Sequence, residues 1–287
     1  MLNHLTRARR FYSWLSGLPE HARAVELAAK ADYKHPKVLT GTLLARMNQS
    51  AQPQDLVDVE FQVFSQFGDD GILQFLVHAL DVQDRTFIEF GVENYTESNT
   101  RFLLAKDKWR GLVIDGGAAN VDFINSDWAT WMFDLRATCA FITAETIETL
   151  IAEAGMSGAI GILSIDIDGV DYWIWNAIRR VDPAILVIEY NAAFGAERAI
   201  TVPYSPDFTR TAAHPSRLYW GASIEALKHL GASKGMTFIG CNGNGNNAYF
   251  VREALADAPQ LASWRSAPAS PYEDWSGPPP PDRPAPS

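Results

Sequence analysis

Hydrophobic residues in the middle of the chain recur with two different periods, and the two kinds of segment alternate. Segments with apolar residues at every third or fourth position predict helices; these are residues 69–80, 97–108, 144–155 and 171–180. Short runs that are apolar almost throughout predict buried strands; these are residues 86–91, 110–117, 159–169 and 184–191. Strands and helices in this alternation predict a parallel sheet with helices on both faces.

Two further patterns lie at the edges of this region. Residues 133–141 alternate apolar with other side chains, which predicts a strand with one exposed face. Residues 235–242 and 247–253 flank the turn "NGNGN", which predicts an antiparallel hairpin. We therefore expect an α/β domain whose mostly parallel sheet ends in an antiparallel hairpin strand.

The two ends of the chain differ from the middle. Residues 1–55 carry Leu, Tyr and Val at helical spacing with arginines between them, which predicts an amphipathic helical extension. Residues 266–287 are rich in proline and poor in apolar side chains, so we expect a tail that forms no packed core. Residues 56–265 remain as one main domain.

Composition and charge narrow the classes of partner. The 287 residues are 47% hydrophobic, enough for a substantial core. The formal charge of -10 disfavours nucleic acids and anionic membranes, because both are bound through clustered Lys and Arg. Two cysteines are too few for a disulfide framework, and no apolar run suggests a membrane span. We expect a cytoplasmic protein, and the sequence leaves open whether it is a homo-oligomer.

Acidic residues follow or end four of the predicted strands. Ligands bind parallel sheets at the carboxyl ends of the strands. Acids gathered at one edge repel each other unless cations or hydroxyl-rich ligands lie between them. The residues selected by this rule are Glu89 and Gly91, Asp115 and Gly116, Asp166 and Asp168, and Glu189 and Asn191.

The first two strand ends indicate a nucleoside without a diphosphate. In "FIEFGVENYTESNT", Gly91 allows the backbone to approach a ligand, and Asp115 at the next strand end can accept hydrogen bonds from ribose hydroxyls. Glu93, Asn94 and Tyr95 stand where a dinucleotide-binding turn has further glycines, so a diphosphate would meet a carboxylate. S-adenosylmethionine has a ribose, no phosphate and cationic groups, and it suits this turn better.

The order of these motifs resembles a known family. The stretches "SQFGDDGIL", "FIEFGVENYTESNT", "WRGLVIDGG", "LSIDIDGVDYWIWNAI" and "VIEYNAAFG" are similar to the class I S-adenosylmethionine-dependent methyltransferases, in particular the FkbM-type branch. The resemblance spans about residues 61–252. It implies a Rossmann-like sheet with a final antiparallel strand, methyl transfer to oxygen, and a small-molecule, sugar or glycan acceptor.

The resemblance also assigns roles to residues. It places Glu89 and Gly91 against the methionine moiety and Asp115 against the ribose. The remaining residues expected to bind the cofactor are Gln66, Asn99, Gly116 and Asp166.

The second acidic cluster suits either a metal or direct contact with substrate. Asp166 and Asp168 are two positions apart, so on a strand they share a face. Asp168, Glu189 and Asn191 offer the oxygen ligands that Mg²⁺ prefers, and such an ion lowers the pKa of an acceptor hydroxyl. Acids that contact substrate or cofactor without a metal are the alternative, and the sequence leaves both open.

Two residues are candidates for the chemical step. Asp168 can act through the metal or as a direct base, and His214 can take a proton from the acceptor. His214 lies in a polar segment flanked by Tyr204, Arg217 and Tyr219, which suggests a lid.

Two other functions compete with methyl transfer. Asp166-Ile-Asp168 is an Asp-x-Asp motif, which a glycosyltransferase uses to hold a metal against a nucleotide-sugar. An inactive binding module is the third reading, and the electrostatic cost of an unused acidic cluster argues against it.

Overall fold

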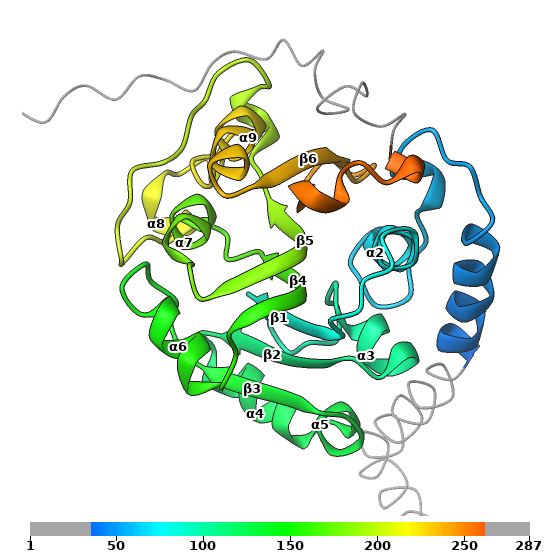
Figure 1. Cartoon of the computed structure of the whole chain (residues 1–287). Helices are drawn as coiled ribbons and strands as arrows, with labels where there is room; N and C mark the ends of the chain where they lie inside the picture. The colour runs from blue at the N-terminus through cyan, green and yellow to red at the C-terminus, as the bar shows by residue number, and fades with distance from the viewer. Residues whose placement is uncertain (1–35, 262–287) are drawn as a thin grey trace, which may run out of the picture.

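The computed structural model describes residues 36–261 and contains a seven-stranded sheet in the order β3-β2-β1-β4-β5-β7-β6 (Figure 1). The strands are β1 (Thr86–Phe90), β2 (Arg110–Asp115), β3 (Leu135–Cys139), β4 (Gly158–Ile165), β5 (Val181–Glu189), β6 (Met236–Cys241) and β7 (Asn247–Arg252). Strands β1 to β5 pair in parallel, and β7 pairs antiparallel with both β5 and β6. The predicted Rossmann-like α/β sheet with an antiparallel C-terminal strand is confirmed.

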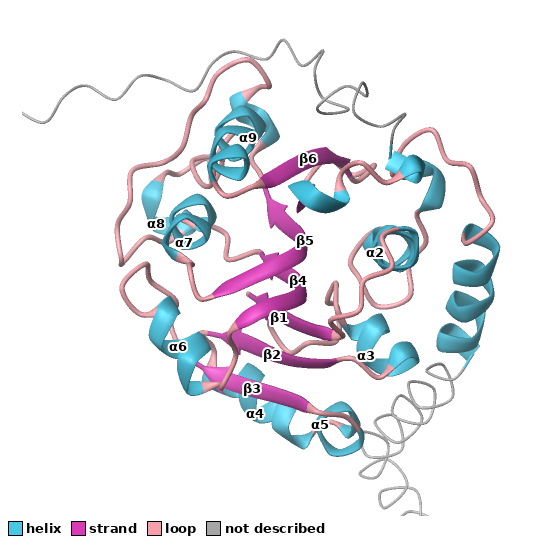
Figure 2. Cartoon of the chain, in the orientation of Figure 1, coloured by secondary structure: helices cyan, strands magenta, loops and turns pink. Residues whose placement is uncertain are grey.

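Helices cover both faces of the sheet (Figure 2). They are α2 (Asp69–Ala79), α3 (Arg101–Asp107), α4 (Ala118–Ser126), α5 (Trp128–Met132), α6 (Ile147–Glu153), α7 (Asp171–Ala177), α8 (Arg210–Ala213) and α9 (Ile224–Ser233). One core cluster joins α2, α3, α4 and α5 to one face, and a second joins α6, α7 and α9 to the other. Along β5, Ile185 and Val187 belong to the first cluster and Leu186 and Ile188 to the second, so the strand is apolar on both faces as predicted.

Helices α4 and α5 have no counterpart in the pattern predicted from sequence. They lie beside the edge strand β3, where only Val121 and Ile124 of α4 and Ala129 of α5 are buried. Trp131 is 84% exposed and Phe123 is 46% exposed. A helix that buries so few residues while exposing aromatic ones lacks the continuous apolar stripe by which helices are recognised.

The expected N-terminal extension is described only from residue 36. Residues 36–48 form a helix, and a Cβ added at Gly41 would lie 2.4 Å from the Val63 side chain, so this helix packs closely on the domain. Lys37 and Asn48 donate hydrogen bonds to the carbonyl oxygens of Val63 and Val59. The rest of the extension and the proline-rich tail at 266–287 lie outside the described residues.

None of the helices between residues 36 and 261 has the length and apolar character required to cross a membrane.

Candidate functional site

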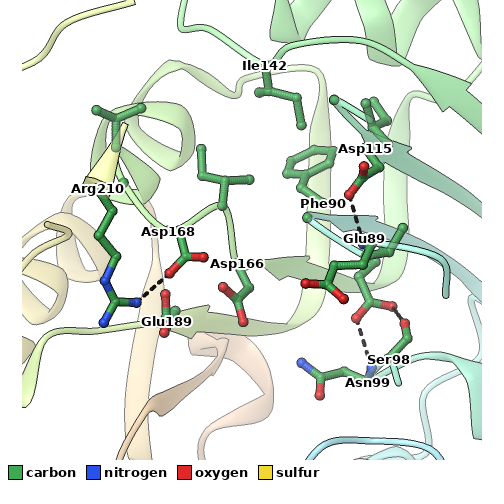
Figure 3. Close-up of a pocket in the computed structure, with 18 of the residues that line it drawn as sticks. Glu89, Phe90, Ser98, Asn99, Asp115, Ile142, Asp166, Asp168, Glu189 and Arg210 are labelled. Atoms are coloured by element: carbon green, nitrogen blue, oxygen red, sulfur yellow. Dashed lines mark hydrogen bonds and ion pairs between the residues drawn. The ribbon is translucent and has the colours of Figure 1, made fainter. Parts of the chain in front are cut away.

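A cavity of about 670 Å³ lies at the carboxyl ends of β1, β2, β4 and β5, a volume within the usual range for small-molecule sites (Figure 3). Residues 140–142 after β3, the segment 208–211 and residues 246–247 of the hairpin also line it. Its lining includes eight acidic residues: Asp69, Glu89, Glu93, Glu97, Asp115, Asp166, Asp168 and Glu189. The acids expected at the four strand ends therefore lie in one cavity.

Glu89 organises the polar run that follows β1. Its carboxylate accepts hydrogen bonds from Ser98 Oγ (2.5 Å), Asn99 N (2.9 Å), and both N and Oγ1 of Thr100. Three of these bonds go to Oε2 and one goes to Oε1, so Oε1 keeps an acceptor site. Burial raises the pKa of Glu89, and the four donors oppose this rise. Glu89 thus holds the loop before α3 in place, and direct contact with a cofactor stays a prediction.

Gly91 allows two strand ends to meet. Its φ is +71°, and a Cβ there would lie 1.5 Å from the carbonyl oxygen of Asp166. Gly91 was predicted to let a ligand approach the backbone. In the structure, the lack of a side chain is already needed for the close contact between this turn and Asp166. Glu93 and Tyr95 also have positive φ, 47° and 61°, so the turn after β1 is unusually constrained.

Asp115, the last residue of β2, is held from three directions. It accepts hydrogen bonds from Glu93 N (2.8 Å), Gly117 N (2.8 Å) and Asn120 Nδ2 (2.9 Å). These bonds fix its carboxylate beside the turn after β1, and about one of its four acceptor sites remains.

Asp166 and Glu189 face each other from neighbouring strand ends (Figure 3). Burial, followed by repulsion from Asp171, raises the pKa of Asp166 to about 7. Burial and repulsion from Asp166 raise the pKa of Glu189 well above its usual range. Within residues 36–261, Glu189 Oε2 is buried and has no hydrogen-bond partner. When one of these two buried carboxyl groups is ionised, it therefore disfavours the ionised form of the other.

Asp168 lies on a turn and not on a strand. Strand β4 ends at Ile165, and Asp168 has a φ of +56°. The carboxylate of Asp171 accepts hydrogen bonds from Ile167 N (2.9 Å) and Gly169 N (3.0 Å). Asp171, the first residue of α7, therefore fixes the backbone of this turn. The turn, rather than strand periodicity, brings Asp166 and Asp168 to the same cavity.

Arg210 of α8 brings a positive charge to this edge. Its Nη1 lies 2.6 Å from Asp168 Oδ1, and its Nε donates to Arg217 O at 2.8 Å. Its guanidinium also lies 4.6 Å from the centre of the Trp220 ring. The predicted lid segment does reach the cavity, through residues 208–211.

Two of the predicted site residues do not line the cavity. The amide of Asn191 donates to the carbonyl oxygens of Leu218 (2.8 Å) and Trp220 (2.9 Å), and its Oδ1 accepts from Ala193 N. His214 Nδ1 bonds to the backbone and hydroxyl of Ser216. In the structure both side chains support the segment after β5, and the roles predicted for Asn191 as a metal ligand and His214 as a base stay predictions.

The predicted magnesium site lacks a suitable set of donors. Within residues 36–261, no three His, Cys, Asp or Glu side chains are grouped as they would be around a metal ion. Asp168 is paired with Arg210, and Asn191 is bound to backbone groups. These residues do not fit a preformed site for a hard cation.

The other predicted residues line the cavity, and several residues that the prediction omitted join them. Gln66, Asn99 and Gly116 are at its wall as expected. Asp69 was missed; it accepts hydrogen bonds from Asn247 Nδ2 (2.9 Å) and Tyr249 OH (2.5 Å), which links the start of α2 to the hairpin. The paired acids in "GDDG" were the signal that could have found it.

Sequence comparisons find no matching family model and no matching curated protein. Among solved structures, the chain is similar to the N-terminal domain of EvdMO1 with SAH bound (12% identity, 66% of this chain and 80% of that chain, TM-score 0.40). It is also similar to an O-methyltransferase from Bacillus cereus in complex with SAH (12% identity, 74% of this chain and 88% of that chain, TM-score 0.41). A third similar structure is that of an O-methyltransferase family protein from Burkholderia thailandensis (10% identity, 75% of this chain and 71% of that chain, TM-score 0.40). Similarities this remote do not establish a function, so the function has to be inferred from the residues of the site.

Proposed function

We propose that this protein is an S-adenosylmethionine-dependent methyltransferase that methylates a hydroxyl group of a sugar, a glycan or another small molecule. The observation that carries the proposal is the position of Asp115. Its carboxylate ends β2, is fixed by three hydrogen bonds, and lines a cavity at the carboxyl edge of the sheet. A carboxylate at this place can accept a hydrogen bond from a ribose hydroxyl.

The charge of the cavity fits this cofactor. Eight acidic residues line it, and Arg210 is the one basic residue among the lining residues of the described chain. S-adenosylmethionine carries a sulfonium and an ammonium group, which such a surface attracts. When bound, the cofactor supplies a methyl group on positively charged sulfur, an electrophile for an acceptor oxygen.

Asp166 is placed to take the proton that the acceptor hydroxyl loses. It lines the cavity and is paired with Glu189 at the end of the adjacent strand. Burial and repulsion raise its pKa to about 7, which suits a general base near neutral pH. With the cofactor bound, the proton that the acceptor hydroxyl loses would pass to the carboxyl pair of Asp166 and Glu189.

No observation favours the glycosyltransferase alternative. The diphosphate of a nucleotide-sugar would enter a cavity dominated by carboxylates, where its charge is repelled. The Asp166-Ile-Asp168 motif would need a free metal-binding face, and Arg210 holds Asp168. Metal-assisted methyl transfer would likewise require Asp168 to release Arg210 before it could bind the ion.

Thermal unfolding in the presence of ligands separates these alternatives. We expect S-adenosylhomocysteine and S-adenosylmethionine to raise the melting temperature, because a ligand at about 100 times its Kd stabilises the folded state by about 2.7 kcal/mol. UDP-glucose should cause no shift, with Mg²⁺ or with EDTA. A shift only with UDP-glucose and Mg²⁺ would support the glycosyltransferase and overturn the proposal. A shift with S-adenosylhomocysteine only when Mg²⁺ is present would restore a role for the metal.

A further inference from the structure

Arg210 is an exception in the charge pattern of the cavity. In the described part of the chain, the lining of the cavity contains eight acidic residues and one basic residue, Arg210. It comes from α8, in the long connection between β5 and α9, and reaches the turn after β4. The protein thus places its own cation on an acid at the edge of the cavity (Figure 3).

The ion pair between Arg210 and Asp168 is accessible to solvent. The side chain of Arg210 is 33% exposed and that of Asp168 is 64% exposed. Ion pairs in such surroundings contribute little net stability, because water competes for both charges. A ligand cation can therefore replace the guanidinium on Asp168 at small cost, while Arg210 keeps its contact with the Trp220 ring.

A second observation at this edge is a buried carboxyl oxygen without a hydrogen-bond partner among the described residues. Glu189 is 9% exposed and lines the cavity, and its Oε2 has no hydrogen-bond partner within residues 36–261. A buried carboxyl oxygen without a partner is costly, so a ligand hydroxyl or ammonium group that forms a hydrogen bond there is favoured. Asp166, Asp168 and Glu189 lie together in Figure 3, so one ligand can reach all three.

We propose that the acceptor is an amine-bearing polyhydroxyl compound, an amino sugar in the simplest case, and that its ammonium group binds Asp168 in the position that Arg210 holds in the structure. The inference rests on the proposed function, because it assigns an acceptor class to the same cavity. Arg210 then acts as an internal competitor that keeps Asp168 paired until an amine arrives. Neutral sugars lack the charge to displace it, and anionic sugars are repelled by the acidic lining.

Three sugars with the same ring and different charge test the acceptor class. Glucosamine, glucose and glucuronate are titrated into the full chain at about 0.15 M salt, with and without S-adenosylhomocysteine. We expect glucosamine to bind roughly tenfold more tightly than glucose, the factor typical of a charge-assisted hydrogen bond. Glucuronate should bind most weakly. Equal binding of glucosamine and glucose would overturn the inference.

Variants of the ion pair separate specific binding from general attraction to an acidic protein. Asp168→Asn should abolish the preference for glucosamine. Arg210→Met keeps an apolar contact with Trp220 but removes the competing charge, so it should tighten glucosamine by about two- to fivefold and leave glucose unchanged. Arg210→Lys and the remote control Arg85→Met should behave like the parent. Weaker glucosamine binding by Arg210→Met would show that Arg210 itself holds the acceptor and would overturn the inference.

The S-adenosylhomocysteine titration in the same samples distinguishes the two proposals. If S-adenosylhomocysteine binds but glucosamine shows no preference, the acceptor class is wrong and the proposed function stands. If S-adenosylhomocysteine does not bind, the proposed function fails, and the sugar titrations without it still decide whether Asp168 is a cation site.

Discussion

The contact between the ends of β1 and β4 at Gly91 can be tested by adding one methyl group. In Gly91→Ala the new Cβ would lie 1.5 Å from the carbonyl oxygen of Asp166, whereas real Cβ contacts are essentially never below 3.0 Å. Gly91 cannot easily move away, because its N–H donates to Ile114 O at 3.0 Å. The end of β4 must shift instead.

The expected destabilisation has two parts. A non-glycine residue at a φ of +71° costs roughly 1–2 kcal/mol. Overpacking of a closed contact costs typically about 1–3 kcal/mol. Together they predict a loss of about 2–5 kcal/mol in the free energy of unfolding, a large share of the roughly 5–15 kcal/mol that holds a domain folded.

Gly155→Ala is the matched control. Gly155 has a φ of +75°, and no heavy atom lies within 4 Å of an added Cβ, so it carries the backbone cost without the clash. Urea unfolding followed by tryptophan fluorescence measures both variants against the parent. Gly91→Ala should lose more stability than Gly155→Ala, and its binding of S-adenosylhomocysteine should weaken because Asp166 is displaced. Equal losses in the two variants would refute the close approach of the strand ends.

Two further predictions concern the carboxylates. Glu89→Gln presents an amide N–H₂ to the four donors around Glu89, so we expect the melting temperature to fall and S-adenosylhomocysteine to bind more weakly; an unchanged melting temperature would contradict the positioning role. The raised pKa of Asp166, about 7 in the folded protein, means that the folded state binds more protons than the unfolded state between about pH 4 and 7. Stability should therefore fall as pH rises through this window, and Asp166→Asn should flatten the fall in a series of urea titrations; a parent more stable at pH 8 than at pH 5 would refute this.

The parts of the fold that bury apolar residues could be predicted from the sequence. Strands such as β5, apolar on both faces, have a pattern that only a covered parallel sheet explains. The helices α4 and α5 could not be predicted because they bury few residues at the edge of the sheet. The hydrophobic periodicity of a sequence reflects which residues are buried, so a helix that buries few residues has only a weak periodicity.

The site could be predicted in position but not in the use of each side chain. Glu89, Asp115, Asp166 and Asp168 do line one cavity, because the strand ends and the turn after β4 place them there. Asn191 satisfies backbone carbonyls of a segment 27–29 residues away in the sequence. Such partners depend on the path of a long connection, and no local pattern encodes that path.

Binding of S-adenosylhomocysteine, measured by calorimetry, is the most direct test of the claim that this cavity holds the cofactor through Asp115. We expect a Kd of about 1 μM or below for the parent. Asp115→Asn should weaken binding by roughly 1.5–3 kcal/mol, or about ten- to a hundredfold, because a charged acceptor is lost. The control Asp122→Asn changes an exposed acid of α4 outside the cavity and should bind like the parent. No binding by the parent, or equal affinity in Asp115→Asn, would contradict the account.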